Sequence, residues 1–247
     1  MPQPVIEWQA GTVTAIRPET RQTKSFTLAL PKWMAHRAGM HYDVRLTAPD
    51  GYRTERSYSV ASAPESVGTI ELTVERIADG EVSPYLHDVV VTGDQIEVRG
   101  PIGGYFVWDV ALGGPLLLVG GGSGVVPLMA MLRHRAAQHA SVPARILYSS
   151  RTPEDVIYRS EFDALAAGDR GFEAFFTFTR QAPPGWTGYR RRIDGAMLQE
   201  VIKPFEKQAR VYVCGPTLLV ESVATALAQM GLPIERIRTE RFGPTGV

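Results

Sequence analysis

A glycine-rich segment is the clearest candidate for a ligand-binding site. It reads Gly120-Gly121-Gly122-Ser123-Gly124 and follows an apolar run at 116–119. Apolar residues at helical spacing come next, so the pattern predicts a strand that turns sharply into a helix. Such a turn offers backbone N–H groups at the positive end of the helix dipole, which suits a phosphate group. Glycine is needed there because a side chain would block the approach of a pyrophosphate. A tight turn without a ligand would have the same sequence, so both interpretations stay open.

This glycine segment departs from two common nucleotide loops. No lysine follows it, as a P-loop requires, and Pro127 stands where the usual dinucleotide motif would continue into its helix. The segment alone therefore does not identify a nucleotide.

A second group of polar residues, Arg56-Ser57-Tyr58-Ser59, ends a predicted strand. A polar patch on an edge strand would look the same. The segment Gly80-Glu81-Val82-Ser83 opens a predicted helix and offers another N-terminus for phosphate. Arg56 would contact an anion bound at this N-terminus, because a guanidinium suits phosphate oxygens. A third segment, Gly100-Pro101-Ile102-Gly103, is by itself only a loop.

The elements that must position these segments differ between the two halves of the chain. In the first half, residues 69–75 alternate polar and apolar side chains, as a strand with one buried face does. Similar short runs occur around Val13 and at 23–30, 42–46, 56–61 and 95–98, with one helix at 82–89. Short strands at this spacing predict a small antiparallel barrel.

The second half alternates strands and helices. We expect strands at 116–119, 145–148, 175–179 and 211–214, and helices after 124 and over 219–230. This order predicts a parallel sheet covered on both faces. The domain border is placed between residues 110 and 111, giving domains 1–110 and 111–247.

Composition narrows the class of protein. The 247 residues carry 26 basic and 26 acidic side chains, and this balance argues against a broad nucleic-acid or membrane-binding face. The single cysteine, Cys214, excludes an intramolecular disulfide and an iron–sulfur cluster held by four thiolates of this chain. We predict no metal site. The opening residues show no signal-peptide pattern and no run reaches the roughly 20 apolar residues of a membrane span, so the expected location is cytoplasmic.

Together, five segments resemble the ferredoxin–NADP reductase superfamily. They are Arg-x-Tyr-Ser at 56–59, Gly-x-x-Ser at 80–83, Gly-Pro-x-Gly at 100–103, Gly-Gly-Ser-Gly-x-x-Pro at 121–127 and Cys-Gly-Pro at 214–216. The resemblance runs from about Trp8 to the C-terminus. It implies an N-terminal antiparallel Greek-key β-barrel that binds FAD, followed by a parallel-sheet, Rossmann-like NAD(P) domain, with no iron–sulfur domain in this chain.

The resemblance assigns FAD contacts to Arg56, Ser57, Tyr58, Ser59, Arg76, Gly80, Val82 and Ser83. Arg56 would hold an FAD phosphate, and the backbone at Val82 and Ser83 would hold the pyrophosphate, with Arg76 nearby. Tyr58 would pack on the isoalloxazine, and Ser59 would hydrogen-bond the nitrogen that accepts the hydride.

It assigns the nicotinamide dinucleotide to Gly121, Gly122, Ser123, Gly124, Val125, Pro127, Cys214, Gly215 and Pro216. Cys214 would lie close to the nicotinamide. The alternative is a buried, apolar cysteine that ends a core strand.

Two features depart from the family pattern. Members often carry Thr where this chain has Ser123, which keeps a hydroxyl group. Many end on an aromatic residue that stacks on the flavin, whereas here either Phe242 covers the ring or the tail at 243–247 folds over the FAD. Glu240 serves either a proton relay or a surface ion pair.

The choice between NADPH and NADH depends on the end of the second strand of the parallel sheet. Ser150 and Arg151 follow that strand, and a hydroxyl with a guanidinium can bind the extra phosphate of NADPH. No acidic residue stands at 149–151 to hold the ribose of NADH, and Arg159, Arg180 and Arg190 to Arg192 are further candidates. We therefore favour NADPH, with NADH as the alternative. An exposed charge after a strand is the alternative interpretation of Arg151.

The resemblance implies an FAD-dependent NAD(P)H oxidoreductase. Three alternatives for the fate of the flavin's electrons stay open. The electrons pass to a separate protein such as a ferredoxin, flavodoxin, haem protein or molybdenum protein, or they pass to a small acceptor such as free flavin, a quinone or a ferric chelate. The third alternative is a regulatory subunit that binds both nucleotides without turnover.

Overall fold

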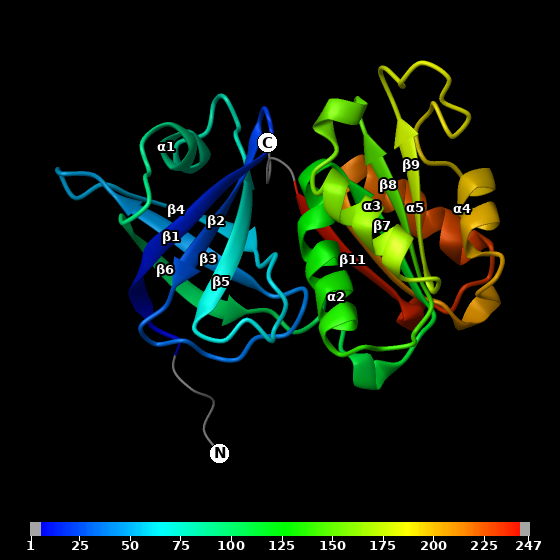
Figure 1. Cartoon of the computed structure of the whole chain (residues 1–247), viewed down its shortest axis with the longest axis horizontal. Helices are drawn as coiled ribbons and strands as arrows, with labels where there is room; N and C mark the ends of the chain where they lie inside the picture. Colours follow the sequence, from blue (N-terminus) through cyan, green and yellow to red (C-terminus); the bar gives the residue numbers. More distant parts are fainter. Residues whose placement is uncertain (1–5, 243–247) are drawn as a thin grey trace. The chain divides into compact units, whose positions relative to one another are not determined.

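The computed structural model describes residues 6–242, and the chain divides into two compact units, both drawn in Figure 1. The first unit reaches Trp108 and also includes Met129–Ala137, and the second contains Asp109–Leu128 and the remainder from Gln138. The sequence placed the border at 110/111 and assigned the whole helix after the glycines to the second domain.

The first unit is an antiparallel barrel of six strands in the order β4-β3-β6-β1-β2-β5. The strands are β1 (Trp8–Thr20), β2 (Thr23–Ala29), β3 (His41–Thr47), β4 (Arg53–Ser59), β5 (Thr69–Glu75) and β6 (Gln95–Ile102). A bridge between Val60 and Leu72 joins the two ends of this order, and the Ala61 N–H donates to the Glu71 carbonyl at 2.7 Å. The antiparallel barrel predicted from the alternating pattern is confirmed.

The barrel closes around apolar side chains that alternate along its strands. Phe26 and Leu28 on β2, Ile70 and Leu72 on β5, and Tyr42 on β3 are at most 2% exposed. The helix α1 (Val82–Asp88) packs against β3, β4 and β5 (Figure 1). Its residues Val82 and Leu86 join the same apolar core because they lie on one helix face.

The segment Met129–Ala137 belongs to this unit by its contacts. Arg133 donates hydrogen bonds to the Ala61 carbonyl at 2.9 Å and to the Glu71 carboxylate at 2.6 Å. His134 lies 2.7 Å from the Glu65 carboxylate. These polar contacts attach the segment to the residues that follow β4 and to β5.

The second unit is a parallel sheet of five strands in the order β11-β10-β7-β8-β9. The strands are β7 (Leu116–Gly121), β8 (Ala144–Ser150), β9 (Phe172–Phe178), β10 (Arg210–Pro216) and β11 (Ile237–Phe242). The helix α2 (Val125–Ala137) begins in this unit and continues as the segment Met129–Ala137 of the first unit. The other helices are α3 (Arg159–Gly168), α4 (Gly195–Ile202) and α5 (Thr217–Gln229). The predicted α/β class with a parallel sheet is confirmed.

Both faces of this sheet are covered. One face packs Val119 and Val213 against α4 and α5, through residues such as Val201 and Val223 (Figure 1). On the other face the rings of Tyr148, Phe162 and Phe176 form mutual contacts, and Phe162 belongs to α3. Burial on both faces explains why β7 is apolar throughout.

Several bounds differ from the sequence prediction. β4 covers Arg53–Ser59 rather than 56–61, because Val60 makes only an isolated bridge. Glu154 and Asp155 form a 3-10 turn, and α3 begins only at Arg159. The sequence prediction did not include α4 and β11. In residues 6–242, none of the helices combines the length and apolar character needed to cross a bilayer.

Candidate functional site

The candidate flavin site begins on β4, where polar residues end the strand. Arg56 is exposed, and within residues 6–242 its guanidinium donates only to the carbonyl of the preceding residue, Glu55, at 2.7 Å. Tyr58 is half-buried against the barrel core, and this burial raises the pKa of its hydroxyl to about 12. Ser59 is 5% exposed and ends the strand. Since side chains alternate along a strand, the cation of Arg56 and the ring of Tyr58 lie on the same face of β4.

The start of α1 is organised by its own side chains. The Ile77 N–H donates to Ser83 Oγ at 3.0 Å, and the Gly80 N–H donates to the Ile77 carbonyl at 3.0 Å. Ser83 is 5% exposed, so its hydroxyl fixes this turn inside the unit and its backbone is the part suited to a ligand. The Tyr52 hydroxyl donates to Glu81 at 3.2 Å and links the turn to the start of β4.

Arg76 has an acidic partner at the other end of α1. Its NH2 group lies 2.8 Å from Asp88 Oδ2, and Nε contributes a second contact at 3.2 Å. The pair is exposed. Arg76 is thus ion-paired in this structure, whereas the exposed guanidinium of Arg56 has no acidic partner among the described residues.

The Gly-Pro-x-Gly segment has a packing role. A Cβ atom on Gly100 would lie 2.6 Å from the ring of Tyr42, so only glycine allows this buried ring to lie against the backbone. Gly103 has a φ of +117°, which side chains rarely adopt. These two glycines are therefore explained by the barrel itself.

The residues of the barrel unit fit FAD by their donor chemistry. An unpaired guanidinium and a helix start suit phosphate oxygens, and a half-buried tyrosine ring offers a surface for an aromatic system.

In the second unit, the chain order gives the place where a ligand is expected. The chain runs from β7 through β8 to β9 on one side and then returns to β10 and β11 on the other. Open α/β sheets bind ligands at the carboxyl ends of the strands where the order reverses, here between β7 and β10. The glycine segment follows β7, and Gly215 and Pro216 end β10. Both predicted dinucleotide segments therefore meet at this switch point.

The glycines at this point allow two strand ends to approach each other. A Cβ atom on Gly124 would lie 2.2 Å from the Cys214 carbonyl oxygen, and one on Gly121 would lie 2.7 Å from Leu219. Gly122 has a φ of +55° within a 3-10 turn that leads into α2. The alternative of a tight turn thus accounts for Gly121 and Gly124 without a ligand. The partly exposed Ser123 and the helix start at Val125, with Pro127 in the first turn, still suit a pyrophosphate.

Cys214 and Glu240 lie opposite each other on β10 and β11. The thiol is fully buried, and burial, followed by the Glu240 carboxyl, raises its pKa well above the usual value. Burial also raises the pKa of Glu240 to about 7. Glu240 Oε2 is buried without a hydrogen-bond partner in the described part of the chain, so a surface ion pair does not describe this residue. The sequence named both residues but did not place them side by side.

The end of β8 gives Ser150 and Arg151 different environments. Ser150 is 5% exposed, and its hydroxyl donates to the Thr152 carbonyl at 3.1 Å. Arg151 is exposed, and its carbonyl accepts from the Arg180 and Gln181 N–H groups at 3.0 and 3.2 Å. The exposed residues Arg151 and Arg180 therefore stand together where β8 and β9 end.

The other candidates of this unit are paired or lie on its loops. Arg159 forms an ion pair with Asp163 at 3.1 Å, and Arg191 forms one with Asp194 at 2.6 Å. Arg190 donates to the Trp186 carbonyl. Phe242 is half-buried at the end of β11, opposite Pro216. The alternative in which the tail at 243–247 covers the FAD lies outside the described residues.

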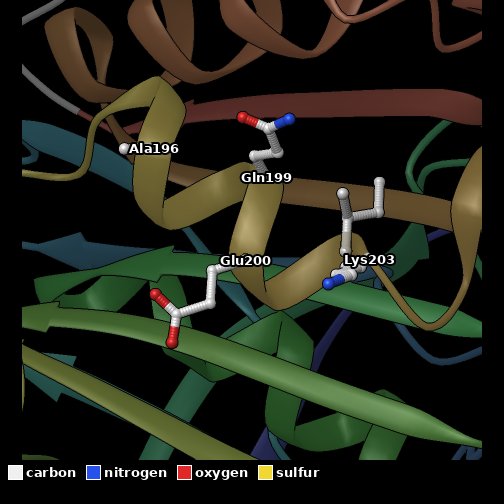
Figure 2. A pocket seen from close by; sticks show the side chains of 5 residues that line it. Ala196, Gln199, Glu200 and Lys203 are labelled. Atoms are coloured by element: carbon white, nitrogen blue, oxygen red, sulfur yellow. The ribbon is translucent and has the colours of Figure 1, made fainter.

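A surface hollow lies along α4 (Figure 2). It is lined by Ala196, Gln199, Glu200, Ile202 and Lys203. These residues all come from α4 and its C-terminal cap, and none comes from a strand end. We therefore assign the hollow no part in the chemistry.

Comparison with protein families gives one match for each unit. The family described as "Oxidoreductase FAD-binding domain" matches residues 10–107, and the family described as "Oxidoreductase NAD-binding domain" matches residues 118–225. The first match falls on the barrel, and the second falls on the α/β unit and also includes the segment Met129–Ala137 of the first unit.

Individual relatives agree with these matches. "Ferredoxin–NADP reductase B" of Sorangium cellulosum is 32% identical over 238 residues, covering 93% of this chain and 96% of that protein. The "Glycine betaine monooxygenase reductase subunit" of Chromohalobacter salexigens is 32% identical over 198 residues, 79% of this chain. This chain spans only 53% of that relative's length. Among solved structures, the FAD/NAD-binding domain of a nitric oxide dioxygenase from Vibrio cholerae gives a TM-score of 0.85 at 25% identity, covering 96% of this chain and 99% of that one.

Proposed function

The chain belongs to the ferredoxin–NADP reductase superfamily, and we propose that it oxidises NAD(P)H at a bound FAD and passes the electrons to a separate redox protein. The observation that carries the proposal is that one chain holds both family matches, the FAD-binding match within the barrel unit and the NAD-binding match mostly within the α/β unit. FAD, when bound, supplies the redox chemistry, because it accepts two electrons as a hydride and can release them singly. The residues of the chain bind and orient the two nucleotides, and they hold or transfer protons.

In the barrel unit, Arg56 and the backbone at the start of α1 bind the two phosphates of FAD. The guanidinium is exposed and has no acidic partner in the described residues, so it loses no ion pair when it binds an anion. Tyr58 packs its half-buried ring on the isoalloxazine. The Ser59 hydroxyl, at the end of the same strand, orients the ring by a hydrogen bond. Ser57, Arg76 and Gly80 complete the proposed FAD contacts.

In the α/β unit, the switch point binds the nicotinamide dinucleotide. The turn from Gly121 to Val125 directs backbone N–H groups toward its pyrophosphate, while Cys214, Gly215 and Pro216 shape the floor beneath the nicotinamide. Glu240 holds a proton near neutral pH, because its buried carboxyl has a pKa of about 7. It is therefore suited to proton exchange close to the thiol of Cys214.

NADPH is the proposed donor. Arg151 and Arg180 are exposed at adjoining strand ends, and two guanidiniums suit the additional phosphate of NADPH. Ser150 contributes to this site through its backbone position, because its hydroxyl already has an internal acceptor. Arg159, Arg190 and Arg192 are further cations of the same unit.

A separate redox protein is the proposed acceptor. One relative is named a ferredoxin–NADP reductase, and others are named reductase subunits or components of monooxygenases. These names describe proteins that supply electrons to a partner. The partner of this chain is therefore proposed to be a one-electron carrier or an oxygenase.

Anaerobic stopped-flow absorbance tests the proposal. The purified protein, loaded with FAD, is mixed separately with NADPH and NADH, and the oxidised-flavin band is followed. We expect fast bleaching with NADPH and slower bleaching with NADH, and then recovery of the band on mixing with an oxidised ferredoxin or flavodoxin. A protein that binds no FAD, or whose flavin stays oxidised, would overturn the proposal. Recovery only with quinone or free flavin would support the small-acceptor alternative instead.

A further inference from the structure

Tyr148 is a buried tyrosine whose hydroxyl reaches the glycine turn of the α/β unit. It lies on β8 opposite Gly120 of β7, and its side chain is fully buried. The hydroxyl donates a hydrogen bond to the Gly122 carbonyl at 3.1 Å and accepts one from the Ile157 N–H at 3.4 Å. One hydroxyl group therefore connects the glycine turn with the segment that precedes α3.

The ring that carries this hydroxyl is fixed by packing. Its centroid lies 6.1 Å from that of Phe162 on α3 and 6.3 Å from that of Phe176 on β9. Ile157, which supplies the N–H group, is itself only 2% exposed. Because a close-packed interior leaves a side chain little freedom to turn, β8, β9 and α3 together set the position of the Tyr148 hydroxyl.

Gly122 is the part of this contact that is able to change conformation. Glycine adopts positive and negative φ values with similar ease, and Gly122 has a φ of +55°. Its carbonyl also accepts from the Val125 N–H within the 3-10 turn, so it receives two hydrogen bonds, which is what its two lone pairs allow. These two bonds select one orientation of the peptide that joins Gly122 to Ser123.

The orientation of this peptide decides which group the turn presents to a ligand. The peptide is trans, so its C=O and N–H groups point in opposite directions. Since the C=O points toward the buried Tyr148 hydroxyl, the Ser123 N–H points away from it, and Ser123 is partly exposed. A rotated peptide would present the carbonyl oxygen instead, which is an acceptor and does not bind phosphate oxygens.

We propose that Tyr148 is a positioning residue for the pyrophosphate of the nicotinamide dinucleotide, because its hydroxyl holds the Gly122–Ser123 peptide with the N–H directed toward this ligand. The inference rests on the proposed function, in which the turn from Gly121 to Val125 binds the pyrophosphate. NADPH and NADH share the pyrophosphate and differ only at the adenosine ribose. The Tyr148 hydroxyl therefore contributes equally to the binding of both cofactors, in contrast to Arg151.

The experiment uses the full chain loaded with FAD and the variant Tyr148→Phe, which removes the hydroxyl and keeps the ring. Stopped-flow reduction of the flavin over a range of NADPH or NADH concentrations gives a dissociation constant and a limiting rate for each cofactor. Inhibition by ADP-ribose, which contains the pyrophosphate but no nicotinamide, separates the two ends of the cofactor. Tyr189→Phe is the matched control, because Tyr189 is a half-buried tyrosine of the same unit that packs against the apolar core beside α4.

We expect Y148F to raise the dissociation constants of NADPH, NADH and ADP-ribose by the same factor, about threefold to tenfold, as loss of one hydrogen bond would cause. The limiting rate of flavin reduction should change by less than about twofold, because the hydroxyl acts on binding that the ground state and the transition state share. Y189F should behave as the wild type. A loss confined to NADPH, an unchanged affinity for ADP-ribose, or an equal loss in Y189F would overturn the inference.

Amide hydrogen exchange of the wild-type protein gives a test that needs no variant. ADP-ribose, at a concentration that inhibits flavin reduction, should slow the exchange of the Ser123 N–H. Exchange that ADP-ribose leaves unchanged would overturn the inference even if Y148F does not fold. These outcomes differ from failure of the proposed function, which would appear as wild-type protein that binds no FAD or whose flavin NADPH does not reduce.

Discussion

The barrel unit and the α/β unit provide their candidate sites by different physical means. In the barrel, the site is built from side chains at the end of β4, and those of Arg56 and Tyr58 are exposed or half-exposed. In the α/β unit, the corresponding point is built from backbone, because Gly121 and Gly124 let β7 and β10 end in close contact. Replacing a side chain in the first unit should therefore affect binding, whereas adding one in the second should affect folding.

The two units also treat ionisable groups differently. The Arg56 guanidinium is exposed to water, whereas Cys214 and Glu240 are largely withdrawn from water, so that burial raises the pKa values of Cys214 and Glu240. A charge in water attracts a phosphate at any pH near neutrality. A buried carboxyl with a pKa of about 7 instead responds to small changes of pH. The barrel site should be sensitive to salt, and the α/β site should be sensitive to pH.

The largest expected effect is that of Gly124→Ala. The added Cβ atom would lie 2.2 Å from the Cys214 carbonyl oxygen and 2.7 Å from the Gly215 Cα atom, both of which are backbone atoms that cannot turn aside. We expect the free energy of unfolding to fall by about 3 kcal/mol or more, measured by urea denaturation of the holoprotein. Gly168→Ala is the control, because a Cβ atom on Gly168 meets no atom within 4 Å. Equal stability of the two variants would contradict the close approach of β7 and β10.

The second effect is that of Arg56→Ala on FAD binding. Loss of a charged hydrogen bond to phosphate should raise the FAD dissociation constant by about 30-fold to 100-fold and leave thermal stability of the apoprotein unchanged. The unchanged stability follows because, within the described residues, the Arg56 guanidinium forms a hydrogen bond only to the Glu55 carbonyl and no ion pair. Titration of the apoprotein with FAD at low and high salt measures the change. Arg53→Ala, an exposed arginine of the same strand, should bind FAD like the wild type, and an equal loss in both variants would indicate a nonspecific charge effect.

The sequence predicted the barrel better than the α/β unit. Residues 69–75 alternate cleanly because one face of β5 is buried, whereas β11 was missed because Arg238, Glu240 and Arg241 give it a polar pattern. α3 buries only Phe162 in full, so its apolar periodicity is weak. α4, by contrast, has an apolar face at helical spacing, formed by Met197, Leu198, Val201 and Ile202, so the sequence does contain the pattern that predicts this helix.

The candidate residues could be named from sequence, but their partners could not. Cys214 meets Gly124 across 90 positions of the chain, and only the parallel pairing of β10 with β11 places Glu240 opposite the thiol. Hydroxyl groups illustrate the same limit. Ser150 is predicted to bind through its hydroxyl, but that hydroxyl donates to the Thr152 carbonyl instead. Ser83 is predicted to bind through its backbone, and the sequence does not show that its hydroxyl accepts from the Ile77 N–H.

The third effect concerns Glu240, whose buried carboxyl should make the stability of the protein depend on pH. Its pKa is about 7 in the folded protein, against 4.5 as the ordinary value, so between these values the folded state keeps a proton that the unfolded chain has lost. Stability should therefore fall as pH rises through this window and stay constant above it. Above the ordinary pKa, the folded state pays free energy to keep the buried carboxyl protonated or to ionise it. Glu240→Gln removes the titrating group, so this variant should be about 1–2 kcal/mol more stable than the wild type near pH 8 and equal to it below about pH 5.

Denaturation at a series of pH values gives the difference directly. Glu235→Gln, on an exposed glutamate of the same unit, should follow the wild-type curve at every pH. If the E240Q curve also ran parallel to the wild type, the Glu240 carboxyl would be solvated in solution. The contrast between a water-exposed barrel site and a dry α/β site would then fail at this position.

The smallest expected effect is that of Arg151→Ala on the choice of cofactor. Arg151 is an exposed side chain in the backbone-built unit, so it tests whether that unit also uses a solvated charge, as the barrel does. We expect the KM for NADPH to rise about fivefold, since contacts of exposed charges are weakened by water and salt, with the KM for NADH unchanged. Arg180→Ala should have a similar effect, because the Arg180 N–H donates to the Arg151 carbonyl and keeps the two residues together.

Arg170→Ala is the matched control. Arg170 is exposed and lies just before β9, at the opposite end of that strand from Arg180. Steady-state kinetics with both nucleotides at two salt concentrations measures all three variants. A loss confined to NADPH and to the R151A and R180A variants would show that the α/β unit combines a backbone turn for the pyrophosphate with solvated cations for the outer phosphate. An equal loss with NADH would assign Arg151 to the part common to both cofactors, and the discrimination between them would then have to come from elsewhere in the unit.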